Sequence, residues 1–220
     1  PSDRLQVVGN ITNTASSRFN PVLVGSSTTG ISPYSVFVSG RYAYVVNNTS
    51  NTLQIFDVST SSPALVGSVG TGGGPLSVFV SGKYAYTANN STDTLQIFDV
   101  SNPSSPVVVG SATTGTSPRS GFVSCRYAYV ANYKSDNLQI FDVSNPSTPV
   151  VVGSVVTGGI RVQSVFVSGS YAYVVNNGLN TLKILNVSNP SSPVVVGSVT
   201  VGTDPFSVFV SGRYAYVANQ

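Results

Sequence analysis

The hydrophobic and polar positions of this chain alternate in short segments that repeat along its length. A typical unit contains "SVFVS", "YAYVVN", "TLQIFDV" and "PVVVGS", each rich in β-branched and aromatic residues. Such residues in period-two alternation predict β-strands. The links "SGR", "NNTSN" and "SNPSSP" carry the Gly, Asn and Pro of tight turns and loops. The pattern therefore predicts antiparallel sheets of four strands, named a to d in chain order.

The unit recurs with a nearly constant period. The tripeptide "YAY" begins at Tyr42, Tyr84, Tyr127, Tyr171 and Tyr214. Four antiparallel strands in a repeat of about 43 residues match the size of a propeller blade. We therefore expect an all-β fold, a five-bladed β-propeller.

The two ends of the chain carry complementary halves of one unit. Leu5–Asn10 matches the start of strand c and Pro21–Ser27 matches strand d, whereas the chain ends after strands a and b. We expect N-terminal strands c and d to pair with C-terminal strands a and b, which closes the ring and removes open sheet edges. A solenoid is the competing architecture, but it would need capping ends. The expected single domain covers 1–220, with a composite blade of 1–27 plus 203–220 and other blades at about 28–69, 70–112, 113–155 and 156–202.

The repeated segments resemble a known family. "YAYVAN", "LQIFDVSNPSSPVVVGS" and the "SVFVSG" of strand a are similar to LVIVD-repeat propellers, and more loosely to YVTN-repeat surface propellers. The resemblance covers nearly the whole chain. It implies a β-propeller and often an exported or surface setting. It implies no particular reaction, because one fold serves many functions.

The amino-acid composition limits which partners and which cellular location we expect. Only 8% of residues are charged, the net charge is +3, and the Lys and Arg residues are scattered singly. Without a basic run we expect no nucleic-acid partner, and without 18 consecutive apolar residues no membrane span. The low charge and the abundance of Ser, Thr and Asn predict an extracellular or surface-exposed protein, on a cell or a virion. Because the chain opens at Pro1 without Met, we also expect that preceding residues were removed.

The side chains that usually perform acid–base chemistry are scarce. The sequence contains no His and no Glu, and Cys125 is its single cysteine. General acid–base catalysis mostly uses His or a carboxylate, and metal sites need several converging ligands. We therefore expect no enzyme, no metal and no cofactor. Asp57, Asp99 and Asp142 end strand c opposite Arg41, Lys83 and Arg126, which indicates ion pairs within blades rather than a ring of catalytic acids.

Departures from the repeat indicate a binding site. The residue just before "SVFV" varies from unit to unit, and strand a enters the ring from this point. The five residues are Tyr34, Leu76, Arg119, Gln163 and Phe206. In a closed ring they surround one mouth of the central channel, with Tyr133 and Lys134 of a neighbouring loop beside Arg119. Neutral drift in tolerant loops is the competing explanation. We hypothesise a ligand-binding site here, since loops on a rigid scaffold commonly carry binding.

Two further groups of residues suggest modification and assembly. The sequon N-x-S/T occurs at six positions, where glycosylation is conceivable in a eukaryotic host: Asn10, Asn47, Asn48, Asn89, Asn90 and Asn186. The long Asn10–Asn20 segment, with Arg18 and Phe19, interrupts the composite blade. We expect Arg18 and Phe19 to contact another subunit in a homo-assembly.

Three hypotheses about function follow. The first is a non-catalytic binding or structural propeller on a surface, whose protein or glycan partner the sequence leaves unknown. The alternative is a lectin-like carbohydrate-binding module with one shallow site per blade. A hydrolase or lyase acting at the channel mouth is the third, and the lack of His and Glu disfavours it most.

Overall fold

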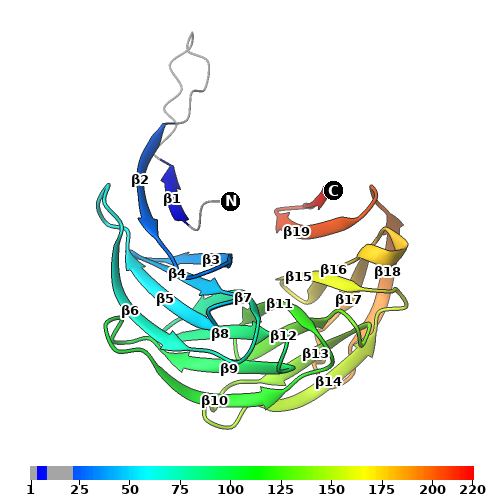
Figure 1. Cartoon of the computed structure of the whole chain (residues 1–220). Coiled ribbons are helices and arrows are strands. Elements are labelled where there is room, and N and C mark those ends of the chain that lie inside the picture. The colour runs from blue at the N-terminus through cyan, green and yellow to red at the C-terminus, as the bar shows by residue number, and fades with distance from the viewer. Residues whose placement is uncertain (1–3, 9–21) are drawn as a thin grey trace.

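The repeated pattern folds into antiparallel sheets arranged around a centre (Figure 1). The structure is a computed structural model that describes residues 4–8 and 22–220. Within these residues it is all-β apart from a short 3₁₀ helix, η1 (Asn177–Leu179). No helix of this part of the chain has the length and hydrophobicity needed to cross a membrane.

Four sheets have four strands each, paired in chain order. Blade 1 contains β3 (Pro33–Ser39), β4 (Tyr42–Asn47), β5 (Thr52–Asp57) and β6 (Ala64–Gly70). Blade 2 contains β7 (Pro75–Ser81), β8 (Tyr84–Asn89), β9 (Thr94–Asp99) and β10 (Val107–Thr113). Blade 3 contains β11 (Pro118–Ser124), β12 (Tyr127–Asn132), β13 (Asn137–Asp142) and β14 (Val150–Val156). Blade 4 contains β15 (Val162–Ser168), β16 (Tyr171–Asn176), β17 (Thr181–Asn186) and β18 (Val194–Thr200).

The two chain ends form two-stranded sheets. One pairs β1 (Arg4–Val8) with β2 (Leu23–Thr28), and the other pairs β19 (Pro205–Ser211) with β20 (Tyr214–Asn219). They are separate sheets, and Figure 1 shows the N- and C-terminal ends on opposite sides of an opening. The predicted blade architecture is thus present, but the pairing of β20 with β1 that would close the ring is not confirmed.

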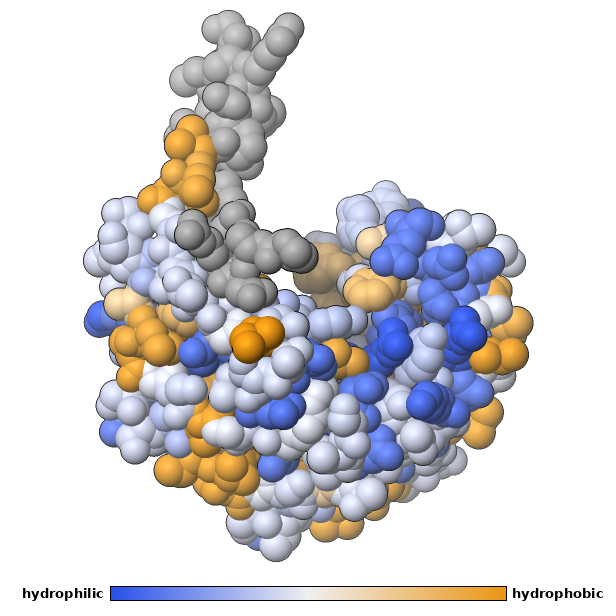
Figure 2. Space-filling view, in the orientation of Figure 1, coloured by the Kyte–Doolittle hydropathy of each residue, from blue (hydrophilic) through white to orange (hydrophobic). Residues whose placement is uncertain are grey.

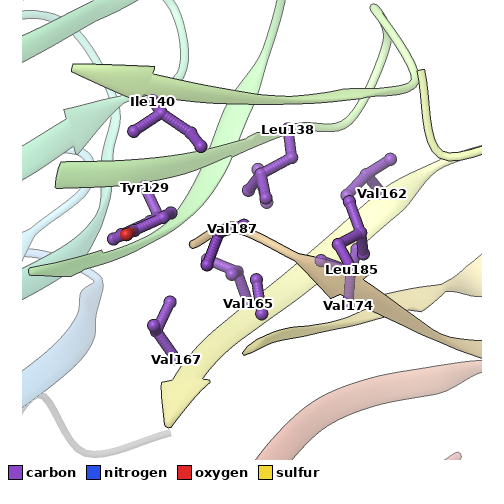
Figure 3. Packing of buried hydrophobic residues seen from close by; sticks show 11 residues of the cluster. Tyr129, Leu138, Ile140, Val162, Val165, Val167, Val174, Leu185 and Val187 are labelled. Atoms are coloured by element: carbon purple, nitrogen blue, oxygen red, sulfur yellow. The ribbon is translucent and has the colours of Figure 1, made fainter. Parts of the chain in front are cut away.

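The hydrophobic core lies between neighbouring blades. Between blades 3 and 4, Tyr129 and Ile140 belong to the same buried cluster as Val165, Ala172 and other residues of blade 4 (Figure 3). Equivalent clusters join blade 1 to blade 2 and blade 2 to blade 3. A large Tyr on one blade therefore packs near a small Ala on the next, as the alternation in "YAY" predicts. Burial of one such aromatic side chain stabilises the fold by roughly 1.5–3 kcal/mol.

Polar contacts also join the blades. In each turn between the second and third strands, an Asx residue adopts positive φ. Its side-chain oxygen accepts a backbone N–H from the loop that enters the next blade. Oδ1 of Asp93 accepts the N–H of Ser117 (2.7 Å), and Oδ1 of Asn180 accepts the N–H of Asp204 (2.9 Å). On the outer strands, a Cβ added at Gly67 would lie 2.0 Å from the carbonyl oxygen of Pro103 in the next blade. Glycine therefore permits the close approach of neighbouring blades there.

The predicted ion pairs within blades are confirmed. Arg41 pairs with Asp57, Lys83 with Asp99 at 3.5 Å, and Arg126 with Asp142 at 2.9 Å. Each Asp also accepts a backbone N–H two residues later, and Asn186 makes the same contact with Ser188 (2.9 Å) in blade 4, where the ion pair is missing. The turn contact is therefore the feature that all four blades share.

Hydrophobic side chains also remain on the outside. The outermost strands expose branched side chains, such as Leu65 (51% exposed) in β6 and Val107 (51%) and Val108 (46%) in β10. Figure 2 shows such orange areas along the outer circumference of the molecule.

Candidate functional site

A bulge at the start of each innermost strand positions the five variable residues. In blade 1 the pairing with β4 passes from Pro33 directly to Ser35, so Tyr34 is left out of the ladder. The same shift leaves out Leu76, Arg119, Gln163 and Phe206. A bulge of this kind aims the extra side chain away from the strand face. This local geometry explains why these positions vary while the neighbouring strand residues repeat.

The five side chains line one pocket of about 240 Å³. They share its wall with the following serines, and the lining residues are Tyr34, Ser35, Leu76, Ser77, Arg119, Ser120, Gln163, Ser164, Phe206 and Ser207. We call this site the mouth pocket. Four complete blades and the β19–β20 sheet each contribute two residues, so the site belongs to the ring rather than to any one blade.

Arg119 is the charged group of the mouth pocket. Its Nη1 donates a hydrogen bond to Oε1 of Gln163 (3.0 Å), and its guanidinium carbon lies 3.7 Å from the centroid of the Tyr133 ring. Gln163 is 5% exposed, and Nε of Arg119 is buried without a hydrogen-bond partner in the described residues. Stacking on an aromatic face and a hydrogen bond on one edge together fix the orientation of the guanidinium.

The serines of the pocket connect consecutive blades. Oγ of Ser35 accepts the N–H of Val78 (3.3 Å), and Oγ of Ser77 accepts the N–H of Gly121 (3.1 Å). Ser120 and Ser164 make the same contact with the next blade, at 3.2 and 3.4 Å. A hydroxyl that accepts in this way still has its own hydrogen to donate. Sequence analysis missed this role, although the presence of Ser in all five units was a usable signal.

A row of phenylalanines follows the serines along the innermost strands. Phe37, Phe79, Phe122, Phe166 and Phe209 form consecutive ring contacts with centroids 4.5 to 5.0 Å apart. Each lies two residues beyond a pocket serine, which is roughly 6.6 Å along a strand. Polar hydroxyls at the mouth therefore give way to an aromatic wall further along the strands.

The structure places the two loop residues of the hypothesised site differently. Tyr133 supports Arg119 from outside the pocket, whereas Lys134 is exposed and does not line it. Arg18 and Phe19, the residues expected in a subunit contact, and the sequon at Asn10 lie outside the described residues.

Two of the candidate glycosylation sites require correction. Asn47 and Asn89 are 0% exposed. Nδ2 of each donates to Oε1 of a Gln in the adjacent third strand of the same blade, Gln54 at 2.9 Å and Gln96 at 3.0 Å. A buried amide nitrogen that is already bonded is not accessible to a glycosyltransferase in the folded protein. Asn48, Asn90 and Asn186 are partly exposed and stay candidates.

Comparison of the sequence with protein families decides the classification. The model of the LVIVD repeat matches at 33–71, 72–114, 121–157, 159–201 and 204–220. The chain belongs to the LVIVD-repeat family. None of the curated proteins compared with it matches.

Solved structures with the same fold share little sequence with this LVIVD-repeat chain. A protein of unknown function from Desulfotomaculum acetoxidans has a TM-score of 0.81 at 16% identity, over 90% of this chain and 66% of its own. The periplasmic gluconolactonase of Pseudomonas aeruginosa has a TM-score of 0.79 at 21% identity, over 92% of this chain and 67% of its own. A candidate 6-phosphogluconolactonase from Bacteroides uniformis has a TM-score of 0.77 at 19% identity, over 100% of this chain and 76% of its own. This chain spans about half to three quarters of the length of the structures it resembles.

These neighbours overturn one prediction from the sequence. We expected the protein not to be an enzyme, because His and Glu are absent. A gluconolactonase has the same propeller fold, and two further neighbours carry a 6-phosphogluconolactonase description. The fold therefore supports catalysis in other proteins, and the absence of His and Glu does not exclude an enzyme. At these identities the likeness establishes the fold alone.

Proposed function

We propose that this LVIVD-repeat propeller is a binding module and that the mouth pocket is its ligand site. The observation that carries the proposal is the convergence of the five variable positions on one pocket lined by every inner strand of blades 1 to 4 and by β19. A pocket of about 240 Å³ lies below the usual range of roughly 300–1,000 Å³ for drug-sized ligands. The ligand is therefore a small molecule or the end of a chain.

The pocket offers two kinds of surface to such a ligand. Tyr34 (46% exposed) and Phe206 (39% exposed) provide an apolar side together with Leu76. Arg119 and Gln163 provide the polar side. A ligand with an apolar part and a polar end satisfies both.

A lectin-like module is the second candidate, and a repeated groove favours it. On the face that carries the "SGR" hairpins, a groove of about 580 Å³ between blades 1 and 2 is lined by Tyr42 and Tyr44 among others. The groove between blades 3 and 4, of about 270 Å³, is lined by the equivalent Tyr127 and Tyr129. The half-buried rings of Tyr42 and Tyr127, with serines nearby, suit sugars, and repetition suits weak multivalent binding.

One screen separates the two candidates. A small-molecule library and a glycan array would be applied to the wild-type protein, to the Tyr34→Ala/Phe206→Ala variant, and to Tyr42→Ala as a variant of the opposite face. The mouth proposal expects hits that the double variant loses and Tyr42→Ala keeps. Hits that survive the double variant and disappear in Tyr42→Ala would replace it with the lectin-like reading.

We also propose that the ring closes through pairing of β20 with β1. The unpaired β20 side exposes Tyr216 at 57%, whereas the equivalent Tyr44 and Tyr129 are each 4% exposed. Closure would bury aromatic surface of this kind, which contributes roughly 1.5–3 kcal/mol for a fully buried side chain.

Each half-blade contacts its neighbouring complete blade in the same way as complete blades contact one another, which supports closure. Gly25 of β2 approaches the carbonyl of Ser61 in blade 1 as Gly67 approaches Pro103 in blade 2. At the other end, the N–H of Val208 in β19 bonds to Ser164 of blade 4 (3.4 Å). Closure then requires only that β20 pair with β1 within the composite blade.

The sequence of β1 also fits this position. Gln6 corresponds to Gln54, whose Oε1 accepts the Nδ2 of Asn47 (2.9 Å) and the N–H of Gly30 (2.9 Å). In the composite blade, Gly202 lies against Asn219 as Gly30 lies against Asn47. Closure would give Gln6 these two donors, Asn219 and Gly202.

An extracellular or surface-exposed setting remains part of the proposal. It is supported by the 8% charged residues and by the Ser-, Thr- and Asn-rich loops. Surface labelling of intact cells or particles of the source, followed by mass spectrometry, tests it. Labelling only after lysis would contradict it.

A further inference from the structure

The mouth pocket presents hydrogen-bond donors on its polar side. Because Oε1 of Gln163 is occupied by Arg119, the free end of the Gln163 amide is its NH₂ group. Four of the pocket serines, Ser35, Ser77, Ser120 and Ser164, use Oγ to accept a backbone N–H, so each of these keeps an O–H to donate. Arg119 has only donors. Side chains of this wall therefore favour a ligand rich in acceptor oxygens.

The charge of the pocket points in the same direction. Among the described residues that line it, Arg119 is the one that carries a charge, and none of them is a carboxylate. The ion partners that neutralise Arg41, Lys83 and Arg126 belong to the opposite face. The positive charge of Arg119 therefore faces the pocket without a lining counter-ion.

Two contacts within the protein orient the guanidinium of Arg119 but leave its charge without a partner among the lining residues. Tyr133 covers one face of the guanidinium and Gln163 takes one edge, which holds the group in place without neutralising it. A pre-oriented guanidinium loses little side-chain entropy when it binds an oxyanion, and such charge-assisted hydrogen bonds are stronger than neutral ones.

We propose that the ligand of the mouth pocket is a small carboxylate, with its apolar or aromatic body against Tyr34 and Phe206 and its carboxylate at Arg119. This rests on the function proposed above and adds the chemical class of the ligand. One guanidinium balances the single charge of a carboxylate. A phosphate monoester carries about −1.5 to −2 at neutral pH and would leave charge uncompensated here.

The test compares benzoate with benzamide, which has the same ring and shape but no charge. Each is titrated into the protein and binding is followed by NMR chemical shifts. We expect benzoate to bind at millimolar concentration and benzamide to bind about ten-fold more weakly, a difference of about 1.4 kcal/mol. Arg119→Gln is expected to abolish this preference and Arg119→Lys to retain part of it.

Arg126→Gln is the matched control, because Arg126 also lies over a Tyr ring, 5.1 Å from the centroid of Tyr127, but on the opposite face. It should leave both titrations unchanged. Equal affinity for benzoate and benzamide, no binding of benzoate at millimolar concentration, or an unchanged preference in Arg119→Gln would each overturn the carboxylate assignment. The mouth proposal itself fails separately, if library hits bind Tyr34→Ala/Phe206→Ala as they bind the wild type.

Discussion

Single glycines of the outer strands set how closely the blades approach. A Cβ at Gly110 would lie 1.9 Å from the carbonyl oxygen of Pro146 in the next blade. A backbone atom at this distance cannot give way without moving the loop. At Gly121 the nearest atom to an added Cβ is 3.8 Å away, which is ordinary contact.

Gly110→Ala is therefore expected to destabilise the fold by about 1–3 kcal/mol, as overpacking does. Gly121→Ala should be neutral or slightly stabilising, because it reduces the freedom of the unfolded chain. Urea unfolding of both variants measures this. Equal stability of the two would show that the blades separate freely at Gly110.

The Asp residues at the ends of the third strands make the stability of the fold depend on pH. The hydroxyl and N–H of Ser101, and then Lys83, lower the pKa of Asp99 below its usual value. A carboxyl whose pKa is lower in the folded state stabilises the fold above its unfolded pKa of about 3.9. That contribution is lost as the pH falls through the lower folded pKa.

We thus expect the melting temperature to fall as the pH drops below about 4, and to fall less steeply in Asp99→Asn. Asn keeps an oxygen for the N–H of the turn, as Asn186 does with Ser188, but it does not titrate. Asn186→Asp is the converse variant and should steepen the acid response. Parallel pH profiles for all three proteins would contradict this assignment.

At the scale of the element, a Gln and an Asn join neighbouring strands in blades 1 to 3. In blade 3, Oε1 of Gln139 accepts Nδ2 of Asn132 (3.0 Å) and the N–H of Gly115 (2.6 Å). Blade 4 has Lys183 at the Gln position, and there Nδ2 of Asn176 and Oγ1 of Thr181 are buried without a partner in the part of the chain that the structure describes. One blade thus lacks an acceptor that the others possess.

Lys183→Gln is expected to stabilise the protein by about 1 kcal/mol, since it restores a hydrogen bond to a buried amide. The matched change Gln139→Lys should destabilise it by about 1–3 kcal/mol, because it leaves buried donors unpaired. Chemical denaturation measures both. If Lys183→Gln were destabilising, the Asn–Gln contact would not be the interaction that matters.

The strands, their order and several pocket residues could be predicted from the sequence. The strands and their order followed from alternation and turn residues because each unit repeats the same local signals. Tyr34 and Arg119 were identified because they vary within a strict repeat. The burial of Asn47 could not be seen, since a sequon motif carries no information about the Gln54 amide that satisfies it.

Other features depend on distances between blades rather than on local pattern. The Ser77 contact to Gly121 exists because two inner strands run side by side, which the sequence of neither strand states. The prediction of a non-enzyme failed for a different reason. Composition is a property of the whole chain, whereas catalysis depends on a few groups in one site.

At the scale of the molecule, the mouth pocket and ring closure depend on each other. Tyr34 and Ser35 belong to β3, whereas Phe206 and Ser207 belong to β19, the innermost strand of the composite blade, which becomes the neighbour of β3 in the proposed ring. A closed ring would hold the two sides of the pocket at a fixed distance. Affinity at the mouth therefore reports on closure.

A cross-link tests most directly whether one chain forms a closed ring with a mouth lined by all of its blades. In the register of Ala131 with Leu138, closure places Ala218 opposite Leu5. Cβ atoms of such pairs lie about 4.5–5.5 Å apart, close to what a disulfide needs. The exposed Cys125 is first replaced by Gly, which the other hairpins carry at the same positive φ.

In this background, Leu5→Cys with Ala218→Cys should form a disulfide within one chain on mild oxidation, detected by mass spectrometry and by migration as a monomer. Leu5→Cys with Val217→Cys, one residue out of register, should form little. Free thiols, or disulfides only between chains, in the Leu5→Cys/Ala218→Cys protein would contradict the closed ring.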